Sequence, residues 1–93
     1  MSGGERPIRQ VPSALCRDLG DEVLLAVAGR PDVDVLTGGA AVVWRLLEHP
    51  VVPSDLAAEL AEPDGAELVE VRAALDDVLA DLRGRGLVEE VAG

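Results

Sequence analysis

The sequence predicts an α+β domain in which a three-stranded antiparallel sheet is followed by three helices. The chain has 93 residues, which is the usual size of one domain. Short apolar runs between turn residues fill its first part, a pattern typical of strands. In the second part, apolar residues recur at helical spacing. Strands that precede helices in this way indicate an α+β fold and not an alternating α/β fold.

The three strands are expected within residues 13–36. The clearest is the apolar run Val23–Val27, which lies between the turn-forming residues Gly20-Asp21 and Gly29–Asp32. A weaker strand is expected at Ala14–Asp18 and a third at Val33–Leu36. Because tight turns join these runs, we expect the strands to be antiparallel neighbours.

Three helices are expected in the second part. Thr37 can cap the first, which ends before Pro50. Pro53 suits the first position of the second helix, and the third runs roughly from Glu67 to Arg83. The apolar faces of the first and third helices are expected to contain Ala41, Val42, Trp44, Leu46 and Leu47, and Leu68, Val71, Leu75, Val78, Leu79 and Leu82, respectively. With a helix-turn-helix-like pair beside a sheet, the predicted fold is winged-helix-like.

The charge and the chain ends predict a cytoplasmic protein. The net charge is -10, so DNA and anionic membranes should repel the chain, and we expect no binding to nucleic acid or membrane. Residues 1–12 are polar and contain glycine and proline, which predicts a flexible tail and no signal peptide. Residues 13–91 are predicted to form a single domain. A single cysteine allows no intramolecular disulfide, which suits a reducing compartment.

No pattern in the sequence is typical of catalysis. A phosphate loop, a dinucleotide fingerprint and a metal-ligand cluster are all missing from it. His49, the one histidine, is expected at the surface, and Cys16 is expected to pack within a strand. Trp44 is expected in the core, where its bulk would replace the missing Phe and Tyr. We therefore predict that the protein is no enzyme and binds no metal or cofactor.

The stretch from Leu15 to Val88 resembles the PqqD family, the peptide chaperones named after pyrroloquinoline quinone biosynthesis. The resemblance rests on four segments in the family's order: Leu36-Thr37, AVVWRLL at 41–47, VVPSDLAAELA at 51–61 and DVLADLRGRGLVEE at 77–90. Segment 41–47 resembles the family's helix that contains an aromatic residue and a Leu-Leu pair. Segment 77–90 resembles the family's last helix, which ends in Gly-Leu. Val52 replaces the family's capping threonine.

The resemblance implies a peptide-binding function. Members of the family act as recognition elements for ribosomally made precursor peptides: they bind the leader region and present it to a modifying enzyme. That enzyme is often a radical SAM protein, and related systems use a cyclase or a protease. The leader is added as an extra strand beside the third strand, in a groove against the third helix. The products are peptide natural products or cofactors.

That mode of binding defines the candidate peptide-binding residues. Strand addition needs an exposed sheet edge, which Val33–Leu36 can supply, with Val33 and Val35 on one face and Asp34 on the other. On a helical wheel, one flank of the third helix carries Val69, Arg72, Asp76, Ala80 and Arg83, and the other carries Glu70, Asp77 and Asp81. We take the arginine-bearing flank as the lip of the groove. The predicted site is Val33, Asp34, Val35, Leu36, Arg72, Leu75, Asp76, Leu79 and Arg83.

Three alternatives stay open. Arg72 and Asp76 could form only a solvated ion pair, worth about 0.3–0.5 kcal/mol. The protein could be a winged-helix DNA-binding regulator, although the helix that would read DNA holds more acidic residues than arginines. It could also be a small acidic carrier protein, although Ser54-Asp55-Leu56 inverts the Asp-Ser-Leu order that a phosphopantetheine arm requires.

Overall fold

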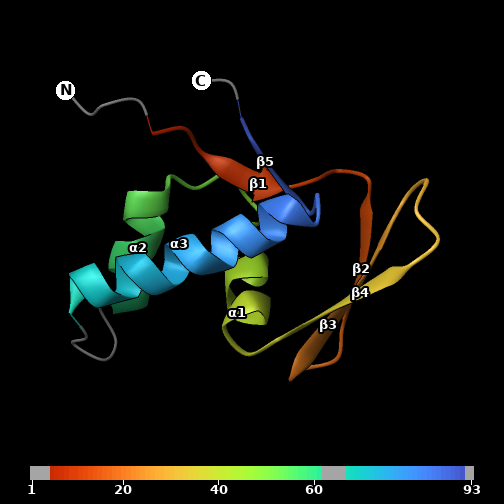
Figure 1. The fold of residues 1–93 in the computed structure, drawn as a ribbon, viewed down its shortest axis with the longest axis horizontal. Coiled ribbons are helices and arrows are strands. Elements are labelled where there is room, and N and C mark those ends of the chain that lie inside the picture. The colour runs from red at the N-terminus through yellow and green to blue at the C-terminus, as the bar shows by residue number, and fades with distance from the viewer. Residues whose placement is uncertain (1–4, 62–66, 92–93) are drawn as a thin grey trace.

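The computed structural model describes residues 5–61 and 67–91, and it confirms three consecutive strands followed by three helices. Two further short strands flank this order. The elements are β1 Ile8–Gln10, β2 Ala14–Asp18, β3 Glu22–Val27, β4 Val33–Thr37, α1 Gly38–Leu46, α2 Pro53–Ala61, α3 Leu68–Gly84 and β5 Val88–Glu90. In Figure 1, α3 crosses the front of the molecule, the sheet β2–β3–β4 lies to one side, and α2 lies at the opposite end.

The main sheet has the strand order β2-β3-β4, and both pairs are antiparallel. Gly20 and Gly29 stand in its two turns with positive φ values of 96° and 86°, which glycine adopts without strain. Val23, Leu25 and Leu36 are buried on the face that the helices cover. The opposite face stays exposed, so the sheet has one buried and one open face.

A second, two-stranded sheet joins the beginning of the described chain to its end. β1 pairs with β5 in antiparallel fashion, and Ile8, which is 1% exposed, also forms an isolated bridge with Val51. The prediction of a flexible tail is therefore wrong for residues 8–10. Residues 1–4 of that predicted tail lie outside the described residues. The strand escaped prediction because it is short and polar apart from Ile8, and its partner lies at the far end of the chain.

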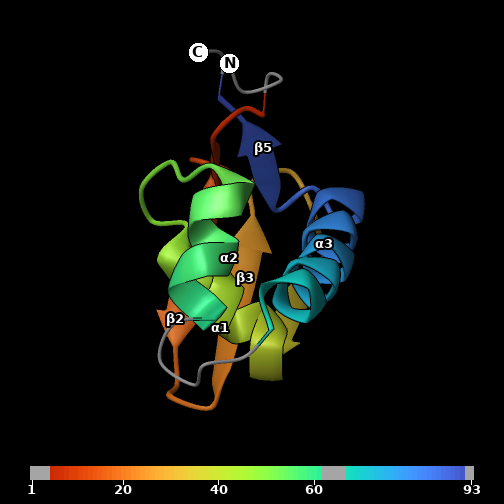
Figure 2. The ribbon, with the colours of Figure 1, turned by 90° about the vertical axis from the view of Figure 1, so that its left-hand side faces the viewer.

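The core lies between the main sheet and the three helices, which Figure 2 shows from the end that carries α2. Trp44 is 1% exposed, so its predicted place in the core is confirmed. Val42, however, is 43% exposed, and Val43 is buried instead. Residue 42 lies about 200° around the helix axis from Trp44, so both cannot face the same neighbours. The core cluster comprises Ile8, Val23, Leu25, Leu36, Ala41, Val43, Trp44, Leu47, Leu56, Ala57, Leu75, Leu79, Leu82, Leu87 and Val88.

The helix boundaries follow local chemistry. Thr37 stands at the N-cap of α1 as predicted, although its side chain makes no capping hydrogen bond to a described residue. Pro53 occupies the first position of α2, and Asp55 its first turn, where the helix dipole favours a carboxylate. In α3, Leu75, Leu79 and Leu82 of the predicted apolar face are buried. Leu68 of that face is 52% exposed at the start of the helix.

The end of α3 is closed by a Schellman motif. The N–H of Leu87 donates to the carbonyl of Leu82 at 2.9 Å, and the N–H of Gly86 donates to the carbonyl of Arg83, also at 2.9 Å. Gly86 takes a φ of 72°, the left-handed conformation that this motif needs. Both Leu82 and Leu87 are fully buried, so the turn also directs β5 back onto the core.

Candidate functional site

The outer edge of β4 is open. Within the described part of the chain, β4 pairs only with β3, in a register that includes Val23 with Leu36 and Leu25 with Asp34. A strand with one unpaired edge presents free N–H and C=O groups to which another extended segment can bind. The edge of β4 is therefore the first component of a candidate binding site.

The hydrogen bonds of the neighbouring hairpin identify which groups of β4 are free. The N–H of Leu19 donates to the carbonyl of Glu22 at 2.8 Å across the β2–β3 turn. Successive residues of an antiparallel strand direct their backbone N–H and C=O groups to opposite sides. From Glu22 onward, every second residue of β3 therefore directs these groups to β2, and the residues between them direct theirs to β4. The backbone groups of Val23 and Leu25 thus bond to β4. Their partners on that strand, Leu36 and Asp34, direct their backbone groups to β3. The backbone groups on the open edge are those of Val33, Val35 and Thr37.

The side chains of β4 divide between the two faces of the sheet. Leu36 is buried and Asp34 is partly buried on the face that carries the core. Val33 and Val35 project from the outer face and are 58% and 47% exposed. A strand added at this edge would direct every second side chain toward the helices and the others toward solvent.

The C-terminal end of α3 lies beside β4. A guanidinium nitrogen of Arg85 lies 3.6 Å from a carboxylate oxygen of Asp34, and Arg85 also bonds to Asp81 at 3.2 Å. From the β3–β4 turn, the Arg30 guanidinium donates to the backbone carbonyl of Arg85. A cation at this position complements the negative end of the helix dipole. These contacts hold the hairpin against α3.

A small apolar cavity opens between α1 and α3 on this same side of α3. It has a volume of about 280 Å³. Val42, Val71 and Val78 stand among its aliphatic lining, and no charged side chain of the described residues lines it. The lining residues are Gly39, Val42, Val43, Leu60, Val71, Ala74, Leu75 and Val78. Since α1 follows directly on β4, the cavity lies close to the end of the open strand.

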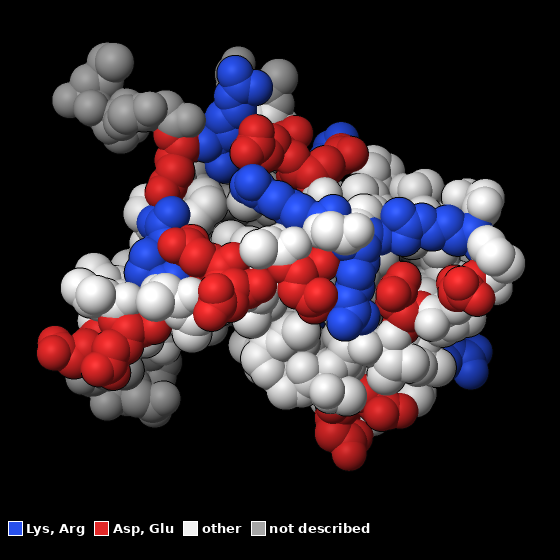
Figure 3. Space-filling view, in the orientation of Figure 1, with Lys and Arg blue, Asp and Glu red and all other residues white. Residues whose placement is uncertain are grey.

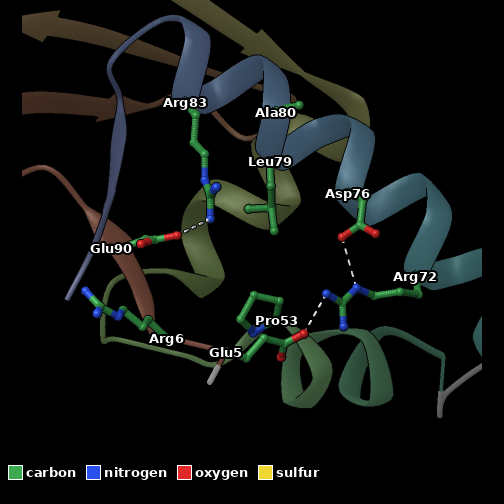
Figure 4. Close-up of a pocket in the computed structure, with 9 residues that line it drawn as sticks. All are labelled: Glu5, Arg6, Pro53, Arg72, Asp76, Leu79, Ala80, Arg83 and Glu90. Carbon is green, nitrogen blue, oxygen red and sulfur yellow. Dashed lines mark hydrogen bonds and ion pairs between the residues drawn. The ribbon is translucent and has the colours of Figure 1, made fainter. Parts of the chain in front are cut away.

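A larger and more polar pocket lies on the opposite flank of α3 (Figure 4). Its volume is about 780 Å³. Arg72 bonds to Glu5 at 2.7 Å and to Asp76 at 2.9 Å, and Arg83 bonds to Glu90 at 3.1 Å. The lining residues are Glu5, Arg6, Pro53, Arg72, Asp76, Leu79, Ala80, Arg83 and Glu90. Both arginines from α3 are thus already paired with carboxylates of the chain itself.

Glu5 is the centre of this pocket's hydrogen bonding. One oxygen accepts from the backbone N–H of Ser54 at 3.0 Å and from its hydroxyl at 2.9 Å, and the other accepts from Arg72. The bond from Arg72, followed by those from Ser54, holds the pKa of the Glu5 carboxyl below its usual value. The same bond raises the pKa of Arg72. The carboxylate therefore serves as a side-chain cap at the start of α2.

The structure separates the predicted site residues into two groups. Arg72, Asp76, Leu79 and Arg83 line the polar pocket, on the flank of α3 opposite to the one from which Arg85 reaches Asp34 of β4. Leu75 is buried and lines the apolar cavity on the side of β4. The arginines therefore do not lie beside the open strand. Helical spacing divides α3 into two flanks, but it does not show which flank faces the sheet, because that depends on how the helix crosses the other elements.

Several residues of the apolar cavity near the end of β4 were missed as candidate site residues, although some of them carry a signal. Glycine and small or aliphatic side chains form the cavity: Gly39, Val42, Val71, Ala74 and Val78. Val71 and Val78 had the spacing of an apolar face, which suggested core and not a surface cavity. The contact of Arg85 with Asp34 joins distant segments, and sequence spacing gives no sign of it.

The remaining His, Cys, Asp and Glu side chains of the described residues form no metal-binding cluster. Over residues 5–61 and 67–91, no three His, Cys, Asp or Glu side chains gather in a way that could hold a metal ion. His49 is exposed beyond the end of α1. Cys16 lies in β2 as predicted but is exposed, so its expected packing role is wrong. No helix in the described ranges is long and apolar enough to span a membrane.

Comparison with known proteins identifies the fold. No protein-family model and no curated protein matches the sequence. A solved structure does match: TbiB1 in complex with the TbiA(beta) leader peptide, with a TM-score of 0.77 and 21% sequence identity, over 91% of this chain and 99% of that chain. The resemblance that the sequence shows to PqqD proteins is thus confirmed at the level of the fold. The chain has the fold of a protein whose structure was solved with a leader peptide bound.

Proposed function

We propose that this protein binds the leader region of a ribosomally made precursor peptide, as an additional strand on the open edge of β4. The observation that carries the proposal is the free edge itself, with the backbone groups of Val33, Val35 and Thr37 directed away from β3. Strand addition supplies affinity through backbone hydrogen bonds, and nearby pockets supply specificity through alternate side chains. The edge of β4 offers the backbone hydrogen bonds, and the apolar cavity near its end offers a pocket for a side chain.

The matching fold supports the binding of a leader peptide. TbiB1 was solved with a leader peptide, and its chain is covered almost completely by the match. The groove that we propose lies between β4 and the flank of α3 that carries Val71, Leu75 and Val78. Arg72, Asp76, Leu79 and Arg83 lie outside it, on the other flank.

Presentation to a modifying enzyme follows from the same proposal. In this proposal the open strand edge contributes recognition, and a second protein performs the chemistry. That second protein would be a radical SAM protein, a cyclase or a protease. We propose that the module acts in the cytoplasm, where precursor peptides are made, and that it needs no cofactor of its own.

The test uses short random peptides displayed on phage and selected on the wild-type protein. Enriched peptides are then synthesised and titrated into the wild type, Val35→Pro and Val35→Thr. Proline removes an N–H that points to the open edge, so the β3–β4 ladder keeps its bonds and the variant should fold. We expect Val35→Pro to weaken binding about tenfold or more, because one lost hydrogen bond and a blocked edge together exceed about 1.4 kcal/mol.

Val35→Thr is the matched control, since it keeps the N–H and the β-branched shape. It should bind within about threefold of the wild type, less than about 1 kcal/mol. Circular dichroism must show that both variants are folded. Equal affinity of a folded Val35→Pro variant would contradict strand addition at β4, and so would a selection that enriches no peptide on the wild type.

A further inference from the structure

We infer that the bound peptide carries an aliphatic side chain close to a lysine or arginine, and that α1 and α3 recognise this pair. The inference rests on the proposed strand addition and specifies the chemistry of the peptide. It comes from the cavity beside β4 and from the charges on the flank of α3 that faces it. It places the lip of the groove on the acidic flank of α3, in place of the arginine-bearing flank that the helical wheel suggested.

The cavity fits an aliphatic side chain. Its volume of about 280 Å³ lies just below the range of about 300–1,000 Å³ in which drug-sized ligands bind, so it suits one or two side chains. Val42 and Ala74 leave it open to solvent, as both are exposed. A polar group inside would lose water without gaining a partner, whereas an aliphatic group gains from leaving water.

The rim of the cavity is acidic. Asp77 precedes Val78 and follows Ala74 by three positions, so it lies on the same flank of α3 as these lining residues. Glu70 and Asp81 lie on that flank as well. Asp81 is paired with Arg85, whereas the arginines Arg72 and Arg83 belong to the far flank.

The surface view agrees with this distribution. Figure 3 shows acidic side chains along the exposed side of α3, basic side chains at its upper edge and right-hand end, and an uncharged area beneath it, over α1. Helical spacing puts Asp77 and Glu70 on the flank of α3 that lines the cavity, so we expect a cationic side chain that leaves the cavity to contact them. The net charge of -10 adds a long-range attraction for a cationic peptide. Hence the aliphatic residue provides the anchor, and the basic residue provides charge complementarity at the rim.

The cavity is tested with two phenylalanine substitutions on α3. Ala74 and Ala80 are both exposed alanines, but Ala74 lines the apolar cavity and Ala80 lines the polar pocket on the far flank. With the peptides selected above as probes, Ala74→Phe should weaken binding about tenfold by filling the anchor's place, and Ala80→Phe should bind within about twofold of the wild type.

The charge at the rim is tested with two lysine substitutions of equal charge. Asp77→Lys should weaken binding about fivefold at low salt, mainly through a slower association rate, and the difference should shrink as salt is added. Glu48→Lys changes the net charge equally but lies at another pocket, with Cys16 and Arg45. It should leave the affinity within about twofold.

The outcomes separate this inference from the proposed function. Peptides that need the Val35 N–H but bind Ala74→Phe and Asp77→Lys as they bind the wild type would overturn the inference and leave strand addition standing. Enriched peptides without a shared aliphatic and basic residue would overturn it too. Loss of affinity in Ala74→Phe and Asp77→Lys, with both controls unchanged, is the expected result.

Discussion

Glu5 shows at the residue scale how one carboxylate connects distant parts of the chain. It accepts hydrogen bonds from Ser54 at the start of α2 and from Arg72 in α3. Arg72 in turn bonds to Asp76 within its own helix. Arg72 was a candidate peptide-binding residue because of its place on the helical wheel. In the structure it connects α3 with the segment before β1 and, through Glu5, with α2.

A substitution of Glu5 should therefore affect stability in a pH-dependent way. Glu5→Gln should lower the free energy of unfolding at neutral pH by about 0.5–1 kcal/mol, a small value because Glu5 and Arg72 are both about one-third exposed and screened. The pKa of Glu5 is lowered in the folded protein. Its contribution is therefore complete above the usual Glu pKa and is lost as the pH falls through the lowered value.

Urea denaturation of both proteins at several pH values measures this difference. The stabilities of the wild type and Glu5→Gln should converge as the pH falls below the usual Glu pKa and through the lowered pKa of Glu5. Glu59→Gln, at an exposed position of α2, serves as the control and should change little at any pH. A constant difference between wild type and Glu5→Gln across the range would disprove the role of the ionised carboxylate.

At the scale of elements, the junction of α3 with the β3–β4 hairpin positions the open strand. Arg30 reaches from the hairpin turn to the carbonyl of Arg85, directly before Gly86. A Cβ atom on Gly86 would collide with the guanidinium of Arg30. The left-handed turn after α3 thus leaves the space that Arg30 occupies, and this contact fixes the edge of β4 relative to the helix.

Two alanine substitutions separate this junction from general helix effects. Gly86→Ala should destabilise the protein by about 1–2 kcal/mol, because φ is 72° there and alanine is strained in that conformation. Gly84→Ala, in the last turn of α3 with open space around it, should be neutral or stabilising by up to about 0.5 kcal/mol. Thermal unfolding of both variants measures the contrast, and equal effects would refute the assigned role of Gly86.

Most helices and strands could be predicted from the sequence, because local residues determine where they begin and end. Features that depend on contacts between distant segments could not be predicted. Turn residues such as Gly20 and Gly29 mark the hairpins, and Pro53 marks the start of α2, so these boundaries are found without knowledge of the rest. The candidate edge at β4 was found in the same way. The helix flank that accompanies it cannot be assigned from the sequence, because the position of Arg72 relative to the sheet depends on the packing of the whole chain.

At the scale of the whole molecule, the pairing of β1 with β5 closes the fold. The side chains of Arg9 and Glu89 are 80 positions apart in the sequence and bond at 2.8 Å. The backbone of Ile8 bonds to Val51 in both directions, at 2.9 and 3.0 Å. Ile8 therefore connects both the last strand and the segment before α2 to the core.

Ile8→Ala should be strongly destabilising. Removal of a buried isoleucine typically costs about 2–5 kcal/mol, a large part of the stability of about 5–15 kcal/mol expected for a domain. Val69→Ala provides the control, because Val69 is 82% exposed and its change should stay within about 0.5 kcal/mol. Urea denaturation followed by Trp44 fluorescence measures both, and a mild effect of Ile8→Ala would show that β1 is dispensable.

The pairing of β1 with β5 also makes the fold suitable for insertion into another protein. Ile8 lies opposite Glu90, so the chain passes into and out of the fold at neighbouring points. In Figure 1 this ladder and α1 lie on opposite sides of α3. Glu90 of β5 lines the polar pocket on one flank of α3, whereas the apolar cavity lies on the other flank. An unrelated enzyme could therefore receive the whole unit as an insertion within a single surface loop. The connections to the host protein, before β1 and after β5, would then leave the open edge of β4 accessible to a peptide.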